Sequence, residues 1–162
     1  MTPSPAVEIA MRPVGRVHGG RTDRDDTDHW GDVTCEVVVD PARFGAPALS
    51  GIGEFSHVEV VFVFDQTSER TDYTVTRPGR GRPDLPAVGV FAERGPRRPN
   101  RIGTTMCEIL AVAGNRLTVR GLDALDGSPV LDLKPVLQQF LPATVRQPDW
   151  VDDLMSQYRA SA

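Results

Sequence analysis

The 162-residue chain has no apolar run long enough to form a membrane-spanning helix. Its longest apolar run, VEVVFVF, has the length of a buried strand. The opening residues, MTPSPAVEIAMRP, contain no basic stretch followed by an apolar one, so we expect no signal peptide. These absences predict a protein that is neither secreted nor embedded in a membrane.

Cysteine is scarce in this sequence. Cys35 and Cys107 lie far apart, and each sits inside an apolar run. That setting favours buried free thiols in a reducing compartment, although the sequence alone leaves a disulfide between them open. We therefore expect a cytoplasmic protein.

Motifs for metal binding and for nucleophilic catalysis are missing as well. The histidines are scattered, and no HxxxH or CxxC spacing occurs, so we expect no metal site. No GxSxG nucleophile elbow is present. The glycine-rich GIGEFS leads into a strand instead of a helix, which excludes a dinucleotide-binding loop. RPGRGRP lacks the GK[ST] ending of a phosphate-binding loop.

What the sequence does contain is a series of short apolar runs. With 40% hydrophobic and 25% charged residues, the composition fits one globular domain, which we place at 1–162 with a core from about 13 to about 140. Gly114-Asn115 joins two of the runs and is typical of a tight hairpin turn. The predicted strands lie at 33–39, 56–64, 88–93, 102–110, 116–121 and 129–135.

Helical periodicity is confined to the end of the chain. Trp150, Leu154 and Tyr158 are spaced at i, i+4 and i+8, with Asp149 before them as a candidate N-cap. This spacing predicts a helix at 149–158. The whole pattern predicts an all-β barrel or sandwich with one short C-terminal helix.

Charge is distributed unevenly, although the net charge is only −4. Residues 77–101 hold seven arginines against Asp84 and Glu93, while residues 21–32 hold five aspartates against two arginines. Both segments could be solvated loops. In the first segment, however, prolines stiffen the stretch RGPRRPN. A stiff loop that presents guanidinium groups and Asn100 is suited to binding an anion or a polar ligand.

A second polar segment, GLDALDGSPVLDLKP at 121–135, surrounds a turn at Asp126-Gly127. Its DGSP sequence is favourable turn chemistry before a strand. Asp132 and Lys134 would share one face of that strand, where opposite charges can pair. The turn could equally offer its carboxylates and backbone groups to the ribose or amine of a ligand.

Together, these two segments resemble the signature of the TsaA-like, or TrmO, family. RPNRIG at 98–103 is followed by LDGSPVLDLKP, as RPNPIG is followed by LDGTPVLDIKP in the family. Upstream, LSGIGEFSHVEVVFVFDQ and VGVFAERGPRRPN also match in order, so the resemblance extends from Pro13 to Pro135. It implies a small all-β barrel of mostly antiparallel strands that binds S-adenosylmethionine (SAM) and assembles as a homodimer. The activity it implies is N6-methylation of threonylcarbamoyl-adenosine beside the tRNA anticodon.

Carried over by position, the resemblance also implies the site residues. Asn100, Asp132 and Lys134 match polar positions that would orient the acceptor amine, with Asp132 as one candidate to accept its proton. The segment DHWG stands where the family has a pocket-lining N-terminal segment, which adds His29 and Trp30. The remaining cofactor contacts would be Asp65, Gln66, Arg94, Thr104, Leu125, Asp126, Gly127 and Ser128.

Several positions depart from the family pattern, and some fall where an acceptor would dock: Glu59, Asp65, Gly95, Arg97, Arg101 and Val136. The acidic segment 21–32 replaces the usual N-terminal loop, whereas a surface for tRNA should be basic. The leading interpretation is a SAM-dependent methyltransferase with tRNA adenosine as acceptor. The alternatives are a methyltransferase of a small molecule or peptide, and a non-catalytic module that binds SAM or a nucleotide.

Overall fold

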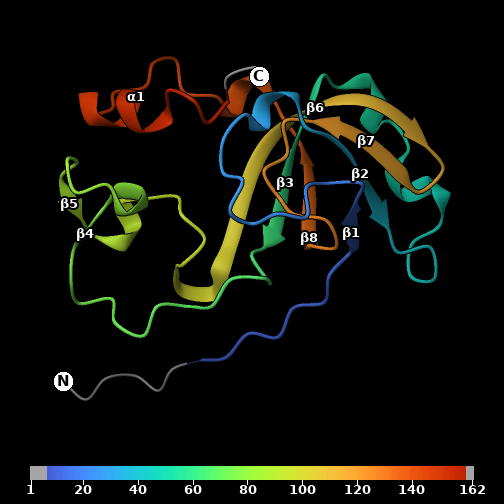
Figure 1. Cartoon of the computed structure of the whole chain (residues 1–162). Coiled ribbons are helices and arrows are strands. Elements are labelled where there is room, and N and C mark those ends of the chain that lie inside the picture. The colour runs from blue at the N-terminus through green and yellow to red at the C-terminus, as the bar shows by residue number, and fades with distance from the viewer. Residues whose placement is uncertain (1–6, 160–162) are drawn as a thin grey trace.

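The computed structural model describes residues 7–159 of the chain. Six strands form a closed barrel in the order β1-β2-β7-β6-β3-β8, and every neighbouring pair is antiparallel (Figure 1). This confirms the small antiparallel barrel and decides between barrel and sandwich. The strands are β1 (Gly15–His18), β2 (Thr34–Val39), β3 (His57–Val63), β6 (Ile102–Ala113), β7 (Arg116–Arg120) and β8 (Pro129–Pro135).

Alternation along the strands fills the barrel with apolar side chains. In β3, Val58, Val60 and Phe62 are buried, while the residues between them are more exposed. Valine suits these positions because its branched side chain packs well on a pleated surface. Residues from the other strands complete the core, among them Val17, Cys35, Val37, Val39, Cys107, Leu117, Val119 and Val130.

Five of the six predicted strands are present, and two short strands, Gly15–His18 and Arg77–Pro78, were not predicted. Gly114-Asn115 closes the β6–β7 hairpin as predicted, with Gly114 at φ 59. The four-residue β1 was not predicted, because so short a strand shows too little alternation to be recognised. The predicted strand at 88–93 is wrong. Only Ala87–Val88 pair there, and Val90–Ala92 form a 3-10 helix that begins after Gly89.

The C-terminal helix is confirmed, but it is shorter than predicted. Helix α1 spans Asp149–Met155, and its N-cap is Pro148 instead of Asp149. Pro148 takes this position because its carbonyl accepts the first helical bond, from Val151 N–H at 2.9 Å. Tyr158 lies beyond the end of the helix, and its hydroxyl donates to Asp123 in the segment between β7 and β8.

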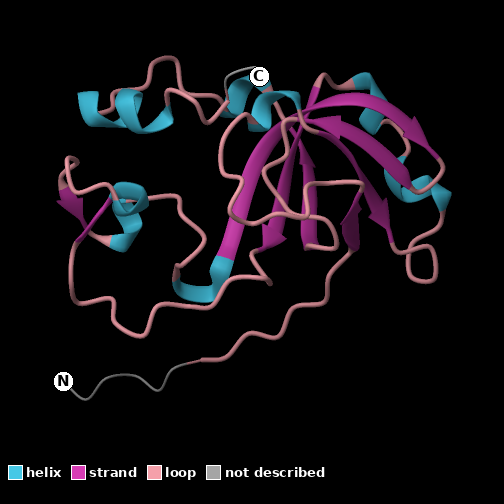
Figure 2. Ribbon diagram, in the orientation of Figure 1, coloured by secondary structure: helices cyan, strands magenta, loops and turns pink. Residues whose placement is uncertain are grey.

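A second, two-stranded sheet lies beside the barrel, and Figure 2 shows it on the same side as α1. Its strands are β4 (Arg77–Pro78) and β5 (Ala87–Val88). We call residues 77–88 the arginine module and residues 149–159 the arm. The other short elements are 3-10 helices: η1 (Trp30–Asp32), η2 (Ala46–Leu49), η3 (Ile52–Glu54), η4 (Gly79–Gly81), η5 (Val90–Ala92), η6 (Pro99–Arg101) and η7 (Gln138–Phe140).

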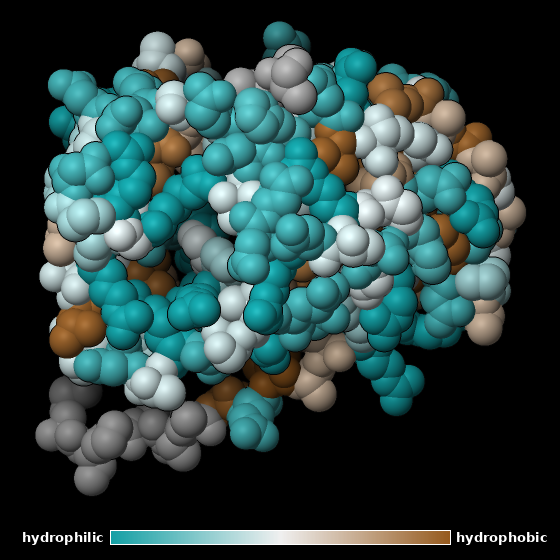
Figure 3. Space-filling view, in the orientation of Figure 1, coloured by the Kyte–Doolittle hydropathy of each residue, from teal (hydrophilic) through white to brown (hydrophobic). Residues whose placement is uncertain are grey.

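The surface is mainly hydrophilic over the face that carries the arm and the arginine module (Figure 3). Among the described residues, no helix has the length and apolar character needed to span a membrane. Large apolar side chains are nevertheless exposed on the segment after β8, at Leu137, Phe140, Leu141 and Val145.

Candidate functional site

One end of the barrel gathers most of the residues that the sequence analysis selected. Because neighbouring strands are antiparallel, β1, β3 and β7 end where β2, β6 and β8 begin. We call this end the rim. Four segments meet there: the acidic loop (21–32), the residues after β3 (64–67), the arginine loop (94–101) and the turn Leu125–Ser128.

The turn Leu125–Ser128 is fixed to the end of β1. Gly127 N–H donates to Val17 C=O at 2.8 Å, and Gly127 adopts φ 80, which glycine reaches without steric cost. The Asp126 carboxylate accepts a hydrogen bond from Gly19 N–H at 2.8 Å. One oxygen of Asp126 therefore holds the turn in place, and a ligand contact would fall to its second oxygen.

The residues after β3 join this turn to the arginine loop. Gln66 Nε2 donates to Asp126 C=O at 3.0 Å. One residue further along, Thr67 C=O accepts a hydrogen bond from Arg101 Nη1 at 3.1 Å. The turn and the arginine loop therefore meet within one protomer, with the exposed residues Asp65 and Gln66 between them.

The end of the arginine loop has a strained backbone. Asn100 and Arg101 adopt φ 61 and φ 51, a left-handed conformation that non-glycine residues seldom take. The loop holds this shape because Arg98 Nη1 donates to Glu93 C=O at 2.9 Å and Arg101 N–H donates to Arg98 C=O at 3.1 Å. As a result, Asn100 is exposed at the rim in a fixed conformation.

Arg94 is bound to the first part of β6. Its Nη2 donates to Thr104 C=O at 2.7 Å and to Thr104 Oγ1 at 3.2 Å, so two predicted cofactor contacts lie side by side. Gly103, before Thr104, is tightly enclosed, because a Cβ there would lie 2.6 Å from Phe62 Cζ. Arg94 is exposed, and since a guanidinium carries five N–H donors, it retains donors for an anion.

The predicted pair of Asp132 and Lys134 forms on the outer face of β8, with 2.6 Å between Lys134 Nζ and Asp132 Oδ2. Hydrogen bonding to Asp132 raises the pKa of Lys134, so its ammonium remains charged. In register, Asp132 lies opposite Val61, and Val61 lies opposite Thr104. Two strand spacings, roughly 10 Å, therefore separate Asp132 from Thr104 on the outer face of the barrel. Both charged residues lie on the barrel wall and not at the rim itself.

The acidic loop packs against the turn through Arg21. Arg21 C=O accepts a hydrogen bond from Asp126 N–H at 2.8 Å, and its guanidinium lies 4.6 Å from the centre of a Trp30 ring. Arg21 Nη2 also donates to His29 C=O at 2.9 Å. Trp30 is only 6% exposed, so its buried indole packs beneath the Arg21 guanidinium and helps to hold the acidic loop in place. Of the two residues predicted in this segment, His29 is the more accessible.

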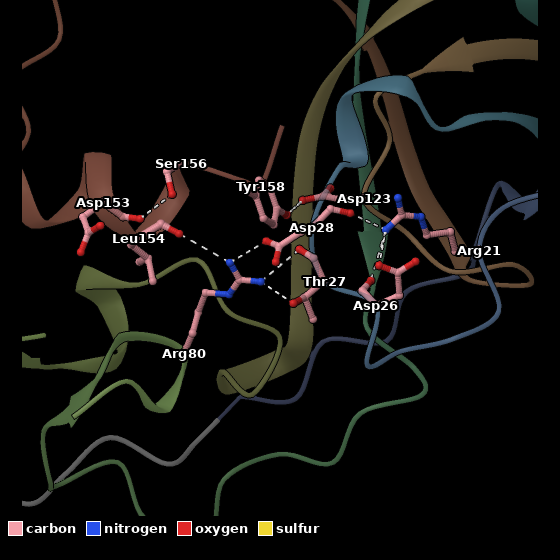
Figure 4. Close-up of polar contacts among 10 residues, drawn as sticks. All are labelled: Arg21, Asp26, Thr27, Asp28, Arg80, Asp123, Asp153, Leu154, Ser156 and Tyr158. Carbon is pink, nitrogen blue, oxygen red and sulfur yellow. Dashed lines mark hydrogen bonds and ion pairs between the residues drawn. The ribbon is translucent and has the colours of Figure 1, made fainter. Parts of the chain in front are cut away.

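The acidic loop and the arginine module partly neutralise each other. Arg80 Nη1 pairs with Asp28 Oδ1 at 2.9 Å, and Arg80 Nη2 donates to Thr27 C=O at 3.1 Å (Figure 4). Arg82 pairs with Asp153 of α1 at 2.9 Å. These arginines tie the loop, the module and the arm together, a role that the sequence analysis did not consider.

Two further residues at the rim received no functional role in the sequence analysis. The Asp123 carboxylate accepts a hydrogen bond from the Tyr158 hydroxyl of the arm (Figure 4). It accepts a second from Thr105 Oγ1 of β6. Burial, reinforced by the charge of Asp123, raises the pKa of Tyr158 well above its usual value, so the phenol remains a donor. For Asp123, the only feature of the sequence that indicates a functional role is its position in GLDALDG, at the start of the polar segment 121–135. The i, i+4, i+8 spacing places Tyr158 only on the face of the predicted helix.

Other parts of the molecule offer weaker sites. Within residues 7–159, no group of three or more histidine, cysteine or carboxylate side chains could hold a metal ion. Cys35 and Cys107 are free and buried, and burial raises the pKa of Cys35 to about 11, so it is a poor nucleophile. A surface hollow near the opposite end of the barrel is lined by Ala48, Ser50, Gly51, Ile52, Glu54, Phe55, Leu133 and Pro135.

A family model described as the tRNA-methyltransferase O N-terminal domain matches residues 25–140. The chain belongs to this family. The matched range contains the arginine loop and the turn Leu125–Ser128, whereas the arm lies outside it. The family match therefore includes both the arginine loop and the turn Leu125–Ser128, which meet at the rim.

Individual relatives cover the chain to different extents. A probable S-adenosyl-L-methionine-binding protein of Methanothermobacter thermautotrophicus is 38% identical over 137 residues, 83% of this chain and 94% of the relative. The mouse tRNA (adenine(37)-N6)-methyltransferase is 38% identical over 93 residues, 57% of this chain and 21% of the relative. The crystal structure of TrmO from Pseudomonas aeruginosa has a TM-score of 0.71 at 25% identity, covering 90% of this chain and 62% of that structure. The chain therefore spans nearly all of the first relative but only part of the other two.

Proposed function

We propose that this chain is a SAM-dependent methyltransferase whose acceptor is N6 of a tRNA adenosine near the anticodon. The observation that carries the proposal is the meeting of the arginine loop and the Asp126-Gly127 turn at one rim, through Gln66 and Arg101. The names of the relatives support it, since one is described as a probable SAM-binding protein and another as a tRNA adenine-N6 methyltransferase.

The side chains at the rim fit the chemistry of the cofactor, which carries a carboxylate, an ammonium and ribose hydroxyls. Exposed Arg94 offers a guanidinium that can fork onto a carboxylate. Asp65 and Asp126 offer carboxylates for an ammonium or a ribose. The other residues that we propose for the cofactor site are His29, Trp30, Gln66, Thr104, Leu125, Gly127 and Ser128, with Trp30 acting as a buried support.

The residues of this chain would act mainly by positioning. SAM supplies a methyl group that is already activated on a sulfonium. Asn100, fixed and exposed at the rim, would orient the acceptor amine for in-line attack. The proton that leaves this nitrogen would pass to water and from there to Asp132 on the barrel wall, while the charged Lys134 keeps its carboxylate in place.

Fewer arginines would contact tRNA phosphates than the seven arginines of residues 77–101 suggest. Phosphate contacts dominate nucleic-acid affinity, but Arg80 and Arg82 are paired with carboxylates. The exposed side chains of Arg77 and Arg97 are better candidates for phosphate contacts. A homodimer would carry two copies of this pair of exposed arginines.

Calorimetry with SAM tests the cofactor site. The wild type should bind, and Arg94→Ala and Asp126→Asn should each weaken binding roughly tenfold or more, because a charge-assisted hydrogen bond contributes about 1.5–3 kcal/mol. Asn100→Ala should lower methyl transfer more than SAM affinity. Arg116→Gln is a matched control, since Arg116 pairs with Glu36 at 2.6 Å on the outer face of the barrel. Unchanged affinity in the first two variants would contradict this placement of the site.

Methyl transfer tests the acceptor. SAM labelled in its methyl group, offered with tRNA that lacks the N6-methyl mark, should transfer its label to the RNA. Label that appears only in a metabolite or peptide extract would favour the small-molecule alternative. Tight SAM binding without transfer to any acceptor would favour a non-catalytic module.

We also propose that residues 1–162 act as one domain and assemble as a homodimer in the cytoplasm. The exposed side chains of Leu137, Phe140 and Leu141 would suit a subunit contact. The free cysteines fit a reducing compartment. Sedimentation velocity over a range of protein concentrations tests the assembly, because a monomer at all concentrations would contradict it.

A further inference from the structure

Asp123 connects three parts of the molecule. It follows β7, it lies two residues before the turn Leu125–Ser128, and its carboxylate binds Thr105 of the barrel and Tyr158 of the arm. An ionised carboxylate only accepts hydrogen bonds, so two converging hydroxyl donors match its chemistry. Thr105 is only 4% exposed, which places the barrel end of this connection in the interior.

The arm in turn holds the segment that carries His29. Strand-like hydrogen bonds run from His29 N–H to Gln157 C=O at 2.9 Å and from Trp30 N–H to Tyr158 C=O at 2.8 Å. Arg80 binds Asp28 of the same segment and also donates to the Leu154 carbonyl of the arm (Figure 4). The position of this part of the acidic loop therefore depends on whether the arm is docked.

The arm is docked mainly by polar contacts, because its helix buries little apolar surface. Helix α1 has seven residues, and isolated helices shorter than roughly 12 residues are marginal in water. No residue of α1 is buried, although Trp150 and Leu154 pack against Gly79. Among these contacts, the one between Asp123 and Tyr158 leads into the barrel, because the same carboxylate also binds Thr105 of β6.

We propose that Asp123 is a positioning residue: by holding Tyr158, it docks the arm and so fixes residues 28–31 beside the turn Leu125–Ser128, completing the cofactor site. This inference rests on the function proposed above. It adds that SAM binding requires the docked arm, which lies outside the residues that match the family model. Asp123 acts through Tyr158 and the acidic loop and does not touch the reacting atoms.

The test compares Tyr158→Phe and Asp123→Asn with the wild type. Tyr158→Phe removes a single oxygen from the arm, so the barrel should fold even if Asp123→Asn does not. Hydrogen exchange at the His29 and Trp30 amides should accelerate roughly tenfold in both variants, as expected for a lost charge-assisted hydrogen bond. The dissociation constant and the KM for SAM should rise by a similar factor, while kcat at saturating SAM stays within roughly twofold.

Glu36→Gln is the matched control, because it converts a carboxylate to an amide in an exposed pair with Arg116. It should change neither the exchange nor the affinity. If the wild type binds no SAM, the proposed function fails and the positioning role fails with it. If the wild type binds SAM but Tyr158→Phe leaves either the exchange or the affinity unchanged, the positioning role alone is overturned.

Discussion

The barrel and the unit beside it, formed by the arginine module and the arm, are stabilised in different ways. The barrel combines a closed ladder of backbone hydrogen bonds with a core in which Val58, Val60 and Phe62 are at most 1% exposed. The neighbouring unit has two strands of two residues each and a helix of seven. Its links to the rest of the chain are mainly hydrogen bonds: from Arg80 to Asp28, from the Tyr158 hydroxyl to Asp123, and from the His29 and Trp30 amides to carbonyls of the arm.

This difference separates folding from site assembly. Burial of apolar surface is the main stabilising term in folding, whereas exposed ion pairs contribute little and are screened by salt. The barrel should therefore form whether or not the arm is docked. The arm and the acidic loop can then be adjusted at the rim without loss of the fold.

The largest predicted effect concerns the barrel core. Phe62→Ala should lower the free energy of unfolding by about 3–5 kcal/mol, because it removes a fully buried ring that packs edge-on against Phe64. Urea denaturation followed by circular dichroism measures this loss. Leu154→Ala, at a half-buried position of the arm, should cost much less. Equal losses would mean that the arm and the barrel unfold as one cooperative unit.

A smaller effect is expected at alkaline pH. Burial raises the pKa of Cys35 from 9.0 to about 11, so folding favours the neutral thiol. The resulting stability is fully present below pH 9.0 and is lost as the pH rises through about 11. Urea midpoints measured between these pH values should therefore fall with pH. Cys35→Ser should flatten that slope, although Cys107, whose pKa burial also raises, would leave part of it.

The smallest effect on global stability is expected at Gly31, whose substitution should release the arm. A Cβ at Gly31 would lie 2.3 Å from Arg159 C=O, so Gly31→Ala should displace the arm from the acidic loop. Trypsin should then cut at Arg146 and Arg159 faster, while the melting temperature changes little. Gly89→Ala is the matched control, because a Cβ there meets no atom within 4 Å. Unchanged cleavage in Gly31→Ala would show that the arm accommodates the methyl group.

The sequence predicted the parts of the site that depend on local chemistry. The Asp126-Gly127 turn could be predicted because an aspartate-glycine pair before a strand favours a turn. The Asp132–Lys134 pair could be predicted because residues two apart on a strand share a face. The prediction failed where the partner lies far along the chain. Arg80 binds Asp28, 52 positions away, and no local pattern in either charged segment indicates that contact.

The sequence by itself determined five of the six barrel strands, the hairpin at Gly114-Asn115 and the family, because side-chain alternation and short motifs are local properties of the chain. Only the tertiary structure decided that the sheet closes into a barrel, that the turn and the arginine loop meet at one rim, and that Asp123 receives the arm. Barrel closure brings distant segments within hydrogen-bonding range, and the choice of partners there depends on geometry that no stretch of sequence encodes alone.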